Sequence, residues 1–386
     1  MNKNVTQILF SIISSALTTS PLSESVKAEI DEKMISQLYE IASLHDLAHI
    51  VGYVLDKEGL LANVCAAEAL KKSTYLAVYR YKQFEYELSV IKKTLEKEKI
   101  DFITLKGSVL RKYYPAPWMR TSCDIDILCR EEDIPRAVDA LVADARYEAS
   151  KKSDYHDVSL RAKSGVHLEL HFNIKENMKS IDGVLEKVWD FAVLNENEHS
   201  YAQTPEFFVL HHIAHMSYHF LHGGCGIRPF IDLYIIEKNI ETNKEVLDGL
   251  LEEAGLLRFY TVSKSLSFAW LEGKAMTDTL LCMQEFLLSG GVYGTRKNRI
   301  AVQQPKKGGG FKYFCSKLIV PYDVLKSQYP VLKKHRWLMP FMQVCRWFRL
   351  LFAGKAKKTI EEMKISSSIT ESESEEMKAF LDEIGL

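Results

Sequence analysis

The chain has 386 residues, of which 47% are hydrophobic and 26% charged, with 50 basic against 51 acidic side chains. This composition excludes a disordered, collagen-like or low-complexity protein. The formal net charge of -1 gives no global attraction to nucleic acid or to an anionic membrane, so any polyanion must be bound by local positive charge. The length predicts two or three domains, each with its own core.

Cysteine usage and hydropathy indicate the compartment. The seven cysteines are scattered without a CxxC pair, which is typical of reduced thiols in a cytosolic protein. No stretch approaches the roughly 20 apolar residues of a transmembrane helix. The apolar run Ile8–Leu17 is interrupted by serines and precedes no A-x-A-like cleavage site, so we interpret it as a short N-terminal helix and not as an export signal. We expect a soluble, cytoplasmic protein without a membrane partner.

The first hundred residues are predicted to be helical. Apolar residues recur at three-to-four spacing around Met34 and Leu38, and a longer run extends from Ala66 to Lys97. Glycine and proline are nearly absent from this part of the chain. We therefore predict an N-terminal helical region over residues 1–100.

From Asp101 the hydrophobic period changes to that of strands. Phe102–Leu105 predicts a strand, Cys123–Cys129 a second one, and the charged run from Arg130 starts a helix predicted to reach about Arg146. Residues 156–162 and 166–172, separated by Lys163-Ser164-Gly165, predict a β-hairpin. These elements predict a small α/β core over residues 101–200.

The rest of the chain is again helical in pattern. Thr204-Pro205-Glu206 has the form of a cap with a first-turn proline, and we predict a helical domain over residues 201–304. Lys306–Gly310 is the most linker-like stretch. A C-terminal helical extension over residues 311–386 follows, with a basic amphipathic helix over Trp337–Phe352 and an acidic break over Ser366–Glu376. The basic helix could hold RNA, but an apolar stripe with solvated arginines is the commoner explanation.

Three carboxylates form the most informative pattern. Strand side chains alternate between faces, so Asp124 and Asp126 share one face of their strand, and Glu169 shares a face with His167 and His171. Apolar residues flank the acids in both strands, which places the acids at a cleft or a very polar surface. Carboxylates that converge require a cation, and an oxygen-rich site suits Mg²⁺ or Mn²⁺ better than zinc.

Lys106-Gly107-Ser108 lies between the first predicted strand and the next helix. Backbone N–H groups at such a position can hold phosphate oxygens, a glycine allows close approach, and Ser108 adds a hydroxyl donor. Acids that bind a metal opposite a phosphate-binding turn are the components of a phosphoryl or nucleotidyl transfer site.

These motifs resemble a known series. Leu105-Lys106-Gly107-Ser108, Arg120–Leu128 with its acid-apolar-acid centre, and His167-Leu168-Glu169-Leu170-His171 are similar to the motifs of the polymerase-beta-like nucleotidyltransferase superfamily. Within it, Lys106, Arg120 and the His-x-Glu-x-His look most like the bacterial family usually labelled "uncharacterised nucleotidyltransferase". The resemblance covers residues 100–172 well and the helical flanks more loosely.

The resemblance implies an α+β fold, a small mixed-sheet nucleotidyltransferase core embedded between N-terminal and C-terminal helical regions. It also implies that Asp124 and Asp126 bind two Mg²⁺ (or Mn²⁺) ions, while Glu169 completes the site of the ion that activates the incoming hydroxyl. Gly107 and Ser108 would hold the β- and γ-phosphates of a nucleoside triphosphate such as ATP. The implied reaction is in-line attack of an acceptor oxygen on the α-phosphorus, with pyrophosphate leaving.

Several polar residues around this core have two interpretations. Lys106 and Arg120 are either further phosphate contacts or surface salt bridges. His167 and His171 either orient the site and contact the acceptor or are ordinary surface histidines. Arg228 is either a triphosphate contact or the local ion-pair partner of Asp232, four residues on.

Five histidines share one side of the helix after Pro205, within about 100° on a helical wheel. They are His211, His212, His215, His219 and His222. His215-x-x-x-His219 could bind a metal, but no further ligand is apparent nearby. We therefore favour a polar stripe that lines the cleft or packs on the α/β core.

We predict a metal-dependent nucleotidyltransferase that uses a nucleoside triphosphate and an unidentified small-molecule, peptide or protein acceptor. The near-neutral charge argues mildly against a long nucleic-acid acceptor. One alternative on the same fold is a kinase that transfers the γ-phosphoryl group. Another is a non-catalytic module that binds a nucleotide or a partner, for which the loss of a carboxylate would be expected.

Overall fold

A computed structural model describes residues 3–62, 65–153, 156–195, 198–292, 294–306, 319–352 and 356–386. The linker predicted at Lys306–Gly310 lies, after Lys306, outside the described residues. In the part of the chain that the structure describes, no helix is both long and apolar enough to cross a membrane. The division into four regions stays a prediction.

The N-terminal helices pack as a small bundle, and the last of them extends far beyond it. They are α1 (Lys3–Thr18), α2 (Glu24–Ala28), α3 (Glu32–Leu44), α4 (Ala48–Lys57) and α5 (Ala67–Lys97). Ile12 and Ile13 of α1 are fully buried, so the serine-interrupted run Ile8–Leu17 is part of a helix as predicted. A Cβ at Gly52 would lie 2.6 Å from the carbonyl oxygen of Leu70, so the close approach of α4 to α5 requires a glycine.

A mixed seven-stranded sheet forms the centre, with the strand order β3-β4-β5-β2-β1-β7-β6. The strands are β1 (Phe102–Thr104), β2 (Asp124–Cys129), β3 (Glu148–Ser153), β4 (Asp157–Arg161), β5 (His167–His171), β6 (Ala192–Leu194) and β7 (Ser200–Gln203). β2 runs parallel to β5 and β1 parallel to β7, whereas the other neighbouring strands are antiparallel.

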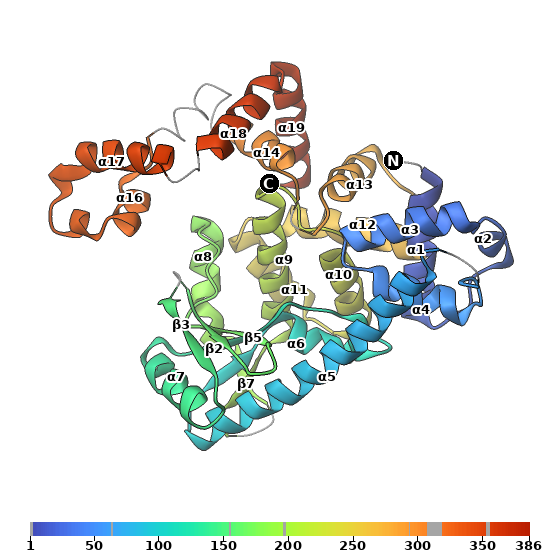
Figure 1. Ribbon diagram of the computed structural model, residues 1–386, viewed down its shortest axis with the longest axis horizontal. Helices are drawn as coiled ribbons and strands as arrows, with labels where there is room; N and C mark the ends of the chain where they lie inside the picture. Colours follow the sequence, from blue (N-terminus) through green and yellow to red (C-terminus); the bar gives the residue numbers. More distant parts are fainter. Residues whose placement is uncertain are drawn as a thin grey trace.

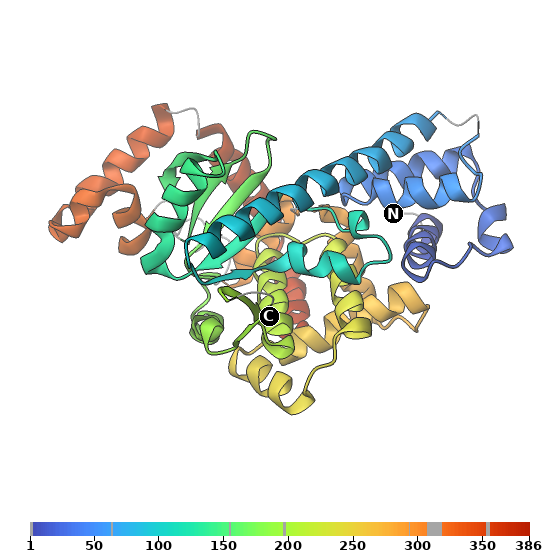
Figure 2. The same ribbon diagram turned by 90° about the horizontal axis from the view of Figure 1, so that it is seen from below.

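Strand alternation separates a dry face of the sheet from a polar one. Ile125 and Ile127 of β2 point into a core closed by α5 and by α7 (Ile134–Ala143), which cover the same face (Figure 1 and Figure 2). Asp124 and Asp126 point to the opposite face, where α9 (Pro205–Leu221) and α10 (Arg228–Asn239) lie. The apolar residues of β2 therefore anchor the strand, and its acids stay available for a site.

Short elements link the strands. They are α6 (Lys106–Leu110), η1 (Arg111–Tyr113), η2 (Pro117–Met119), η3 (Glu131–Asp133), α8 (Lys179–Leu185) and η4 (Glu186–Trp189). The remaining C-terminal elements are α11 (Lys244–Glu253), α12 (Leu257–Glu272), α13 (Asp278–Gly290), α14 (Arg296–Lys306), α16 (Tyr322–Gln328), η5 (Pro330–Lys333), η6 (Arg336–Leu338), α17 (Met339–Phe352), α18 (Ala356–Ser368) and α19 (Glu371–Ile384). Figure 1 shows α16 and α17 as an arm that projects from the body.

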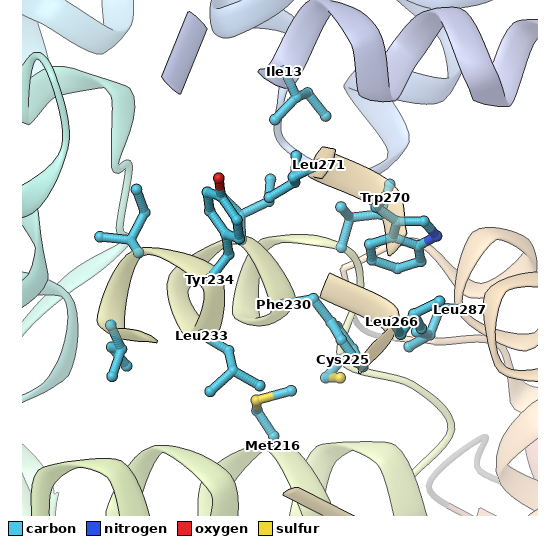
Figure 3. Packing of buried hydrophobic residues seen from close by; sticks show 14 of the residues in the cluster. Ile13, Met216, Cys225, Phe230, Leu233, Tyr234, Leu266, Trp270, Leu271 and Leu287 are labelled. Atoms are coloured by element: carbon cyan, nitrogen blue, oxygen red, sulfur yellow. The ribbon is translucent and has the colours of Figure 1, made fainter. Parts of the chain in front are cut away.

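The helical part has a continuous apolar core around α10. Figure 3 shows Phe230 of α10 between Met216 of α9 and Trp270 of α12, and Leu233 of α10 beside Met216. The ring of Phe230 packs edge-on against that of Trp270, with centroids 5.3 Å apart. This core fixes α9 and α10 relative to each other, and both helices contribute walls to the site described below.

The strands and caps of the core agree with the pattern-based prediction, with some differences. The hairpin forms as β4 and β5, and Thr204 caps α9 by accepting a hydrogen bond from the N–H of Phe207. β3, β6 and β7 were not predicted. The acidic break expected over Ser366–Glu376 is wrong for most of its length, because Thr370 and Glu373 form a capping box that starts α19 at Glu371.

Candidate active site

The three predicted carboxylates meet on the polar face of the sheet. In the parallel register of β2 and β5, Asp124 lies opposite His167 and Asp126 opposite Glu169. Because paired residues on neighbouring strands point to the same face, Asp124, Asp126 and Glu169 share one surface. The predicted alternation of these acids is confirmed by this register.

Two cationic side chains partly neutralise this cluster. Nζ of Lys106 lies 3.3 Å from Oδ1 of Asp126, and Nε2 of His171 lies 3.0 Å from the same oxygen. His171 also approaches Oε2 of Glu169 at 3.5 Å. Lys106 is the first residue of α6 and adopts a left-handed backbone with φ of 46°, a strain on the order of 1 kcal/mol. Lys106 therefore pairs inside the site and not in a surface salt bridge.

The surrounding charges shift the pKa values of the two aspartates in opposite directions. Burial, together with Asp126 and Glu169, raises the pKa of the Asp124 carboxyl to about 6. Burial alone would also raise the pKa of Asp126, but Lys106 and His171 outweigh it and hold that pKa below its usual range. The hydrogen bond from His171 lowers the pKa of Glu169. Asp124 thus carries the part of the negative charge that the protein's own cations leave uncompensated.

The donor set fits a hard divalent cation. Among the described residues, ligand atoms lie within 4.8 Å of one another in the trio Asp126, Glu169 and His171 and in the trio Asp124, His167 and Glu169. Both trios share Glu169 and contain mainly carboxylate oxygens, the ligands that Mg²⁺ and Mn²⁺ prefer. The uncompensated charge at Asp124 is a further feature that such an ion would relieve.

Arg120 forms a buried ion pair beside the carboxylates. Its Nε donates to both carboxylate oxygens of Asp232, at 2.8 and 2.9 Å, and the hydroxyl of Tyr114 donates to Asp232 at 2.6 Å. The guanidinium lies against Gly107, where a Cβ would be 3.2 Å from Nη1 of Arg120. The glycine therefore gives Arg120 the room to lie against the backbone at the start of α6.

The local ion pair considered for Arg228 and Asp232 is wrong. Nη1 of Arg228 lies 2.8 Å from Oδ2 of Asp46, in the turn between α3 and α4, whereas Asp232 binds Arg120. The same Asp46 oxygen accepts a hydrogen bond from the hydroxyl of Thr121. Helix spacing identifies only local neighbours, and here the tertiary fold supplies closer partners.

One pocket of about 290 Å³ brings these groups together. Its lining includes Lys106, Gly107, Arg120, Asp124, Asp126, Glu169 and Arg228 from the predicted site, and His211, His212, His215 and His219 from α9. Ser108 lines a separate groove along α5. His167 accompanies Glu169 on β5 and lies 2.5 Å from the hydroxyl of Ser159 through Nε2.

Most histidines of α9 have partners that explain them structurally. His211 pairs with the side chain of Gln203, His212 donates to the carbonyl of Pro229 at 2.9 Å, and His222 donates to the carbonyl of Tyr218 at 2.7 Å. His215 instead binds Glu176 through Nδ1 at 2.7 Å and faces His219 through Nε2 at 3.1 Å. The favoured prediction of a polar stripe at the cleft agrees with this placement.

Three site residues were missed by sequence reasoning. They are Asp46, Tyr114 and Glu176, which hold Arg228, Asp232 and His215 respectively. Glu176 lies 39 residues from His215, and no spacing rule connects them. Only the tertiary fold reveals such partners.

The structure places an acid-apolar-acid strand beside a parallel strand with a third acid, on a mixed sheet flanked by helices, as the resemblance to nucleotidyltransferases predicts. The profile of the uncharacterised nucleotidyltransferase family matches residues 31–272, which is more than half of the chain. The chain belongs to this family, and the α+β fold with a nucleotidyltransferase core is confirmed. None of the curated proteins and none of the solved structures matches the chain.

Proposed function

We propose that the protein transfers a nucleoside monophosphate from a nucleoside triphosphate to a hydroxyl of a small-molecule, peptide or protein acceptor and releases pyrophosphate. The observation that carries this proposal is the convergence of Asp124, Asp126 and Glu169 on one wall of a pocket that Lys106, Arg120 and Arg228 also line. Acidic and basic groups thus face the same space, as a metal-bound triphosphate requires.

The residues divide into two groups by charge. Asp124, Asp126 and Glu169 would hold Mg²⁺ or Mn²⁺, which when bound stabilises the charge on the entering and leaving oxygens. Lys106 and Arg228 bind phosphate oxygens in this proposal. Lys106 exchanges its contact with Asp126 for one with the nucleoside triphosphate. Arg120, already paired with Asp232, shapes the start of α6 around Gly107. Ser108 remains a proposed hydrogen-bond donor to a phosphate oxygen, although its side chain lines the separate groove along α5.

Product analysis tests the proposal. The protein is incubated with Mg²⁺, with each of ATP, CTP, GTP and UTP labelled at the α- or the γ-phosphate, and with a nucleotide-free extract of small molecules and peptides. We expect transfer of the α-label and release of pyrophosphate, both lost in Asp126→Asn. Transfer of the γ-label with formation of a nucleoside diphosphate would assign a kinase instead, and binding without turnover a non-catalytic module.

A further inference from the structure

His215 and His219 form a hydrogen-bonded pair on the pocket wall opposite the carboxylates. They lie one turn apart on α9, and their rings are nearly perpendicular, with an interplanar angle of 81° and centroids 4.4 Å apart. Both line the pocket that Asp126 and Glu169 also line. The other histidines of this stripe bind groups outside it or the helix backbone, whereas His215 and His219 contact each other.

Glu176 determines which nitrogen of each ring carries a proton. A carboxylate can only accept, so Nδ1 of His215 is the protonated nitrogen in the 2.7 Å contact with Oε1 of Glu176. Nε2 of His215 is then an acceptor, and Nε2 of His219 must donate across 3.1 Å. Nδ1 of His219 is left without a proton. Glu176 is itself anchored, because its backbone N–H donates to Oδ1 of Asp182 at 2.8 Å.

Both rings are neutral in the pocket without a nucleotide. Burial lowers the pKa of His219 to about 3 and that of His215 well below its ordinary value. The charged or titratable groups that face the pair are Lys106 on α6, Asp126 on β2, His171 on β5 and Glu176, and on or next to α9 they are His211, His212, Tyr218 and His222. A bound triphosphate adds negative charge to this pocket and raises both pKa values.

We propose that His219 and His215 form a proton relay that accepts the proton of the acceptor hydroxyl, with Glu176 as the positioning residue. This inference rests on the proposed function, because the hydroxyl attacks a nucleoside triphosphate. If Asp124, Asp126 and Glu169 hold the cation, its positive charge lowers their basicity. The unprotonated nitrogen of His219 is then a base on the opposite wall.

The proposed step moves one proton along the histidine pair and one electron pair to the leaving pyrophosphate. The O–H bond of the acceptor breaks, and its proton passes to Nδ1 of His219, whose Nε2 proton passes to Nε2 of His215. The acceptor oxygen forms a bond to the α-phosphorus, and the bond from that phosphorus to the bridging oxygen breaks, with its electron pair leaving on pyrophosphate. The imidazolium formed at His215 keeps its hydrogen bond to the carboxylate of Glu176.

A metal ion between the two Nε2 atoms is the competing explanation. A carboxylate that orients a histidine also occurs behind metal ligands. Among the described residues, however, no third His, Cys, Asp or Glu ligand completes a trio with this pair. Two ligands alone are fewer than the three protein ligands of catalytic zinc sites, which favours the relay.

The first test measures the tautomers directly. Two-bond nitrogen–proton NMR of ¹⁵N-histidine-labelled protein, assigned with His215→Gln and His219→Gln, should show a protonated Nδ1 on His215 and an unprotonated Nδ1 on His219. Glu176→Ala should average the tautomers of His215, and Glu176→Gln, whose amide oxygen still accepts, should retain them. The opposite tautomers, or averaging in the wild type, would overturn the relay. A shift of both Nε2 signals with Zn²⁺ alone would assign a metal site instead.

The second test measures proton uptake on nucleotide binding, from calorimetry with each of the four triphosphates and Mg²⁺ in buffers of different ionisation heat. We expect uptake at pH 6 in the wild type and in His222→Gln, since His222 does not line the pocket, and its loss in His219→Gln. At pH 8 we expect binding without uptake, because Nδ1 of His219 must stay unprotonated to act as a base. Uptake at pH 8 that His219→Gln abolishes would overturn the relay, because the base would already carry a proton, and would leave the proposed function intact. If none of the four binds while the tautomers are as expected, the proposed function fails and the relay with it.

Discussion

Replacing Asp124 by asparagine should stabilise the protein, although the change removes a residue of the proposed site. The pKa of this carboxyl is raised to about 6, against roughly 4 for an ordinary aspartate. Two pKa units correspond to about 3 kcal/mol in the free energy of unfolding. We reduce this value to about 2 kcal/mol because Asp124 is only partly buried. Ionised Asp124 destabilises the folded protein, because burial and the neighbouring Asp126 and Glu169 oppose its ionisation.

The sign follows from proton linkage. The folded protein binds this proton more tightly than the unfolded chain, so the wild type loses stability as pH rises from about 4 to about 6 and stays destabilised above that range. Asp124→Asn does not titrate. The stability difference between Asp124→Asn and the wild type should therefore be near zero at pH 4 and about 2 kcal/mol at pH 8.

Denaturant unfolding at both pH values, without divalent cations, measures this difference. Asp139→Asn is the matched control, because Asp139 lies exposed on α7 and its neutralisation should change stability by less than about 0.5 kcal/mol. An equal gain for Asp124→Asn at pH 4 and pH 8, or no gain at either, would refute the electrostatic reasoning.

Three other changes test separate parts of the site. Asp232→Ala should cost about 3–5 kcal/mol in denaturant unfolding, because it leaves the buried charge of Arg120 without a partner, and a loss below about 1 kcal/mol would show that the pair is dispensable. Gly107→Val should weaken nucleotide affinity in calorimetry, since its side chain would displace Arg120, whereas Gly249→Val, in open space, should not; equal affinities would exclude a role for this close approach. Glu169→Gln should slow nucleotidyl transfer more than it weakens nucleotide binding in single-turnover assays, and the reverse order would remove Glu169 from the reacting centre.

The carboxylate wall could be predicted from the sequence because strand alternation is a local property. Asp124, Asp126 and Glu169 each lie between apolar residues, and the alternation that points Ile125 into the core places the acids on the opposite face of the sheet. The resemblance to the family motifs predicted the order in which the glycine motif and the two acidic strands follow one another along the chain. Chain-local patterns of this kind depend on neighbours one or two residues away, which a single sequence displays.

The outer strands of the sheet and the opposite wall of the pocket could not be predicted, because their partners are distant in the chain. β7 pairs with β1 across about a hundred residues and has only four residues, too few to show a period. Arg228 reaches Asp46 over 182 residues, which spacing on one helix cannot indicate. The histidines of α9 were recognised as a stripe, but their separate roles depend on Glu176, Gln203 and Pro229.

The most direct test of the account is thermal stability with ATP, CTP, GTP and UTP, with and without Mg²⁺, for the wild type and the double variant Asp124→Ala/Asp126→Ala. A nucleotide at about 100 times its Kd should stabilise the protein by roughly 2.7 kcal/mol. We expect a Mg²⁺-dependent increase in Tm with at least one triphosphate, and none in the double variant. The absence of any increase in the wild type, or an equal increase in the double variant, would contradict a metal-dependent nucleotide site at these carboxylates.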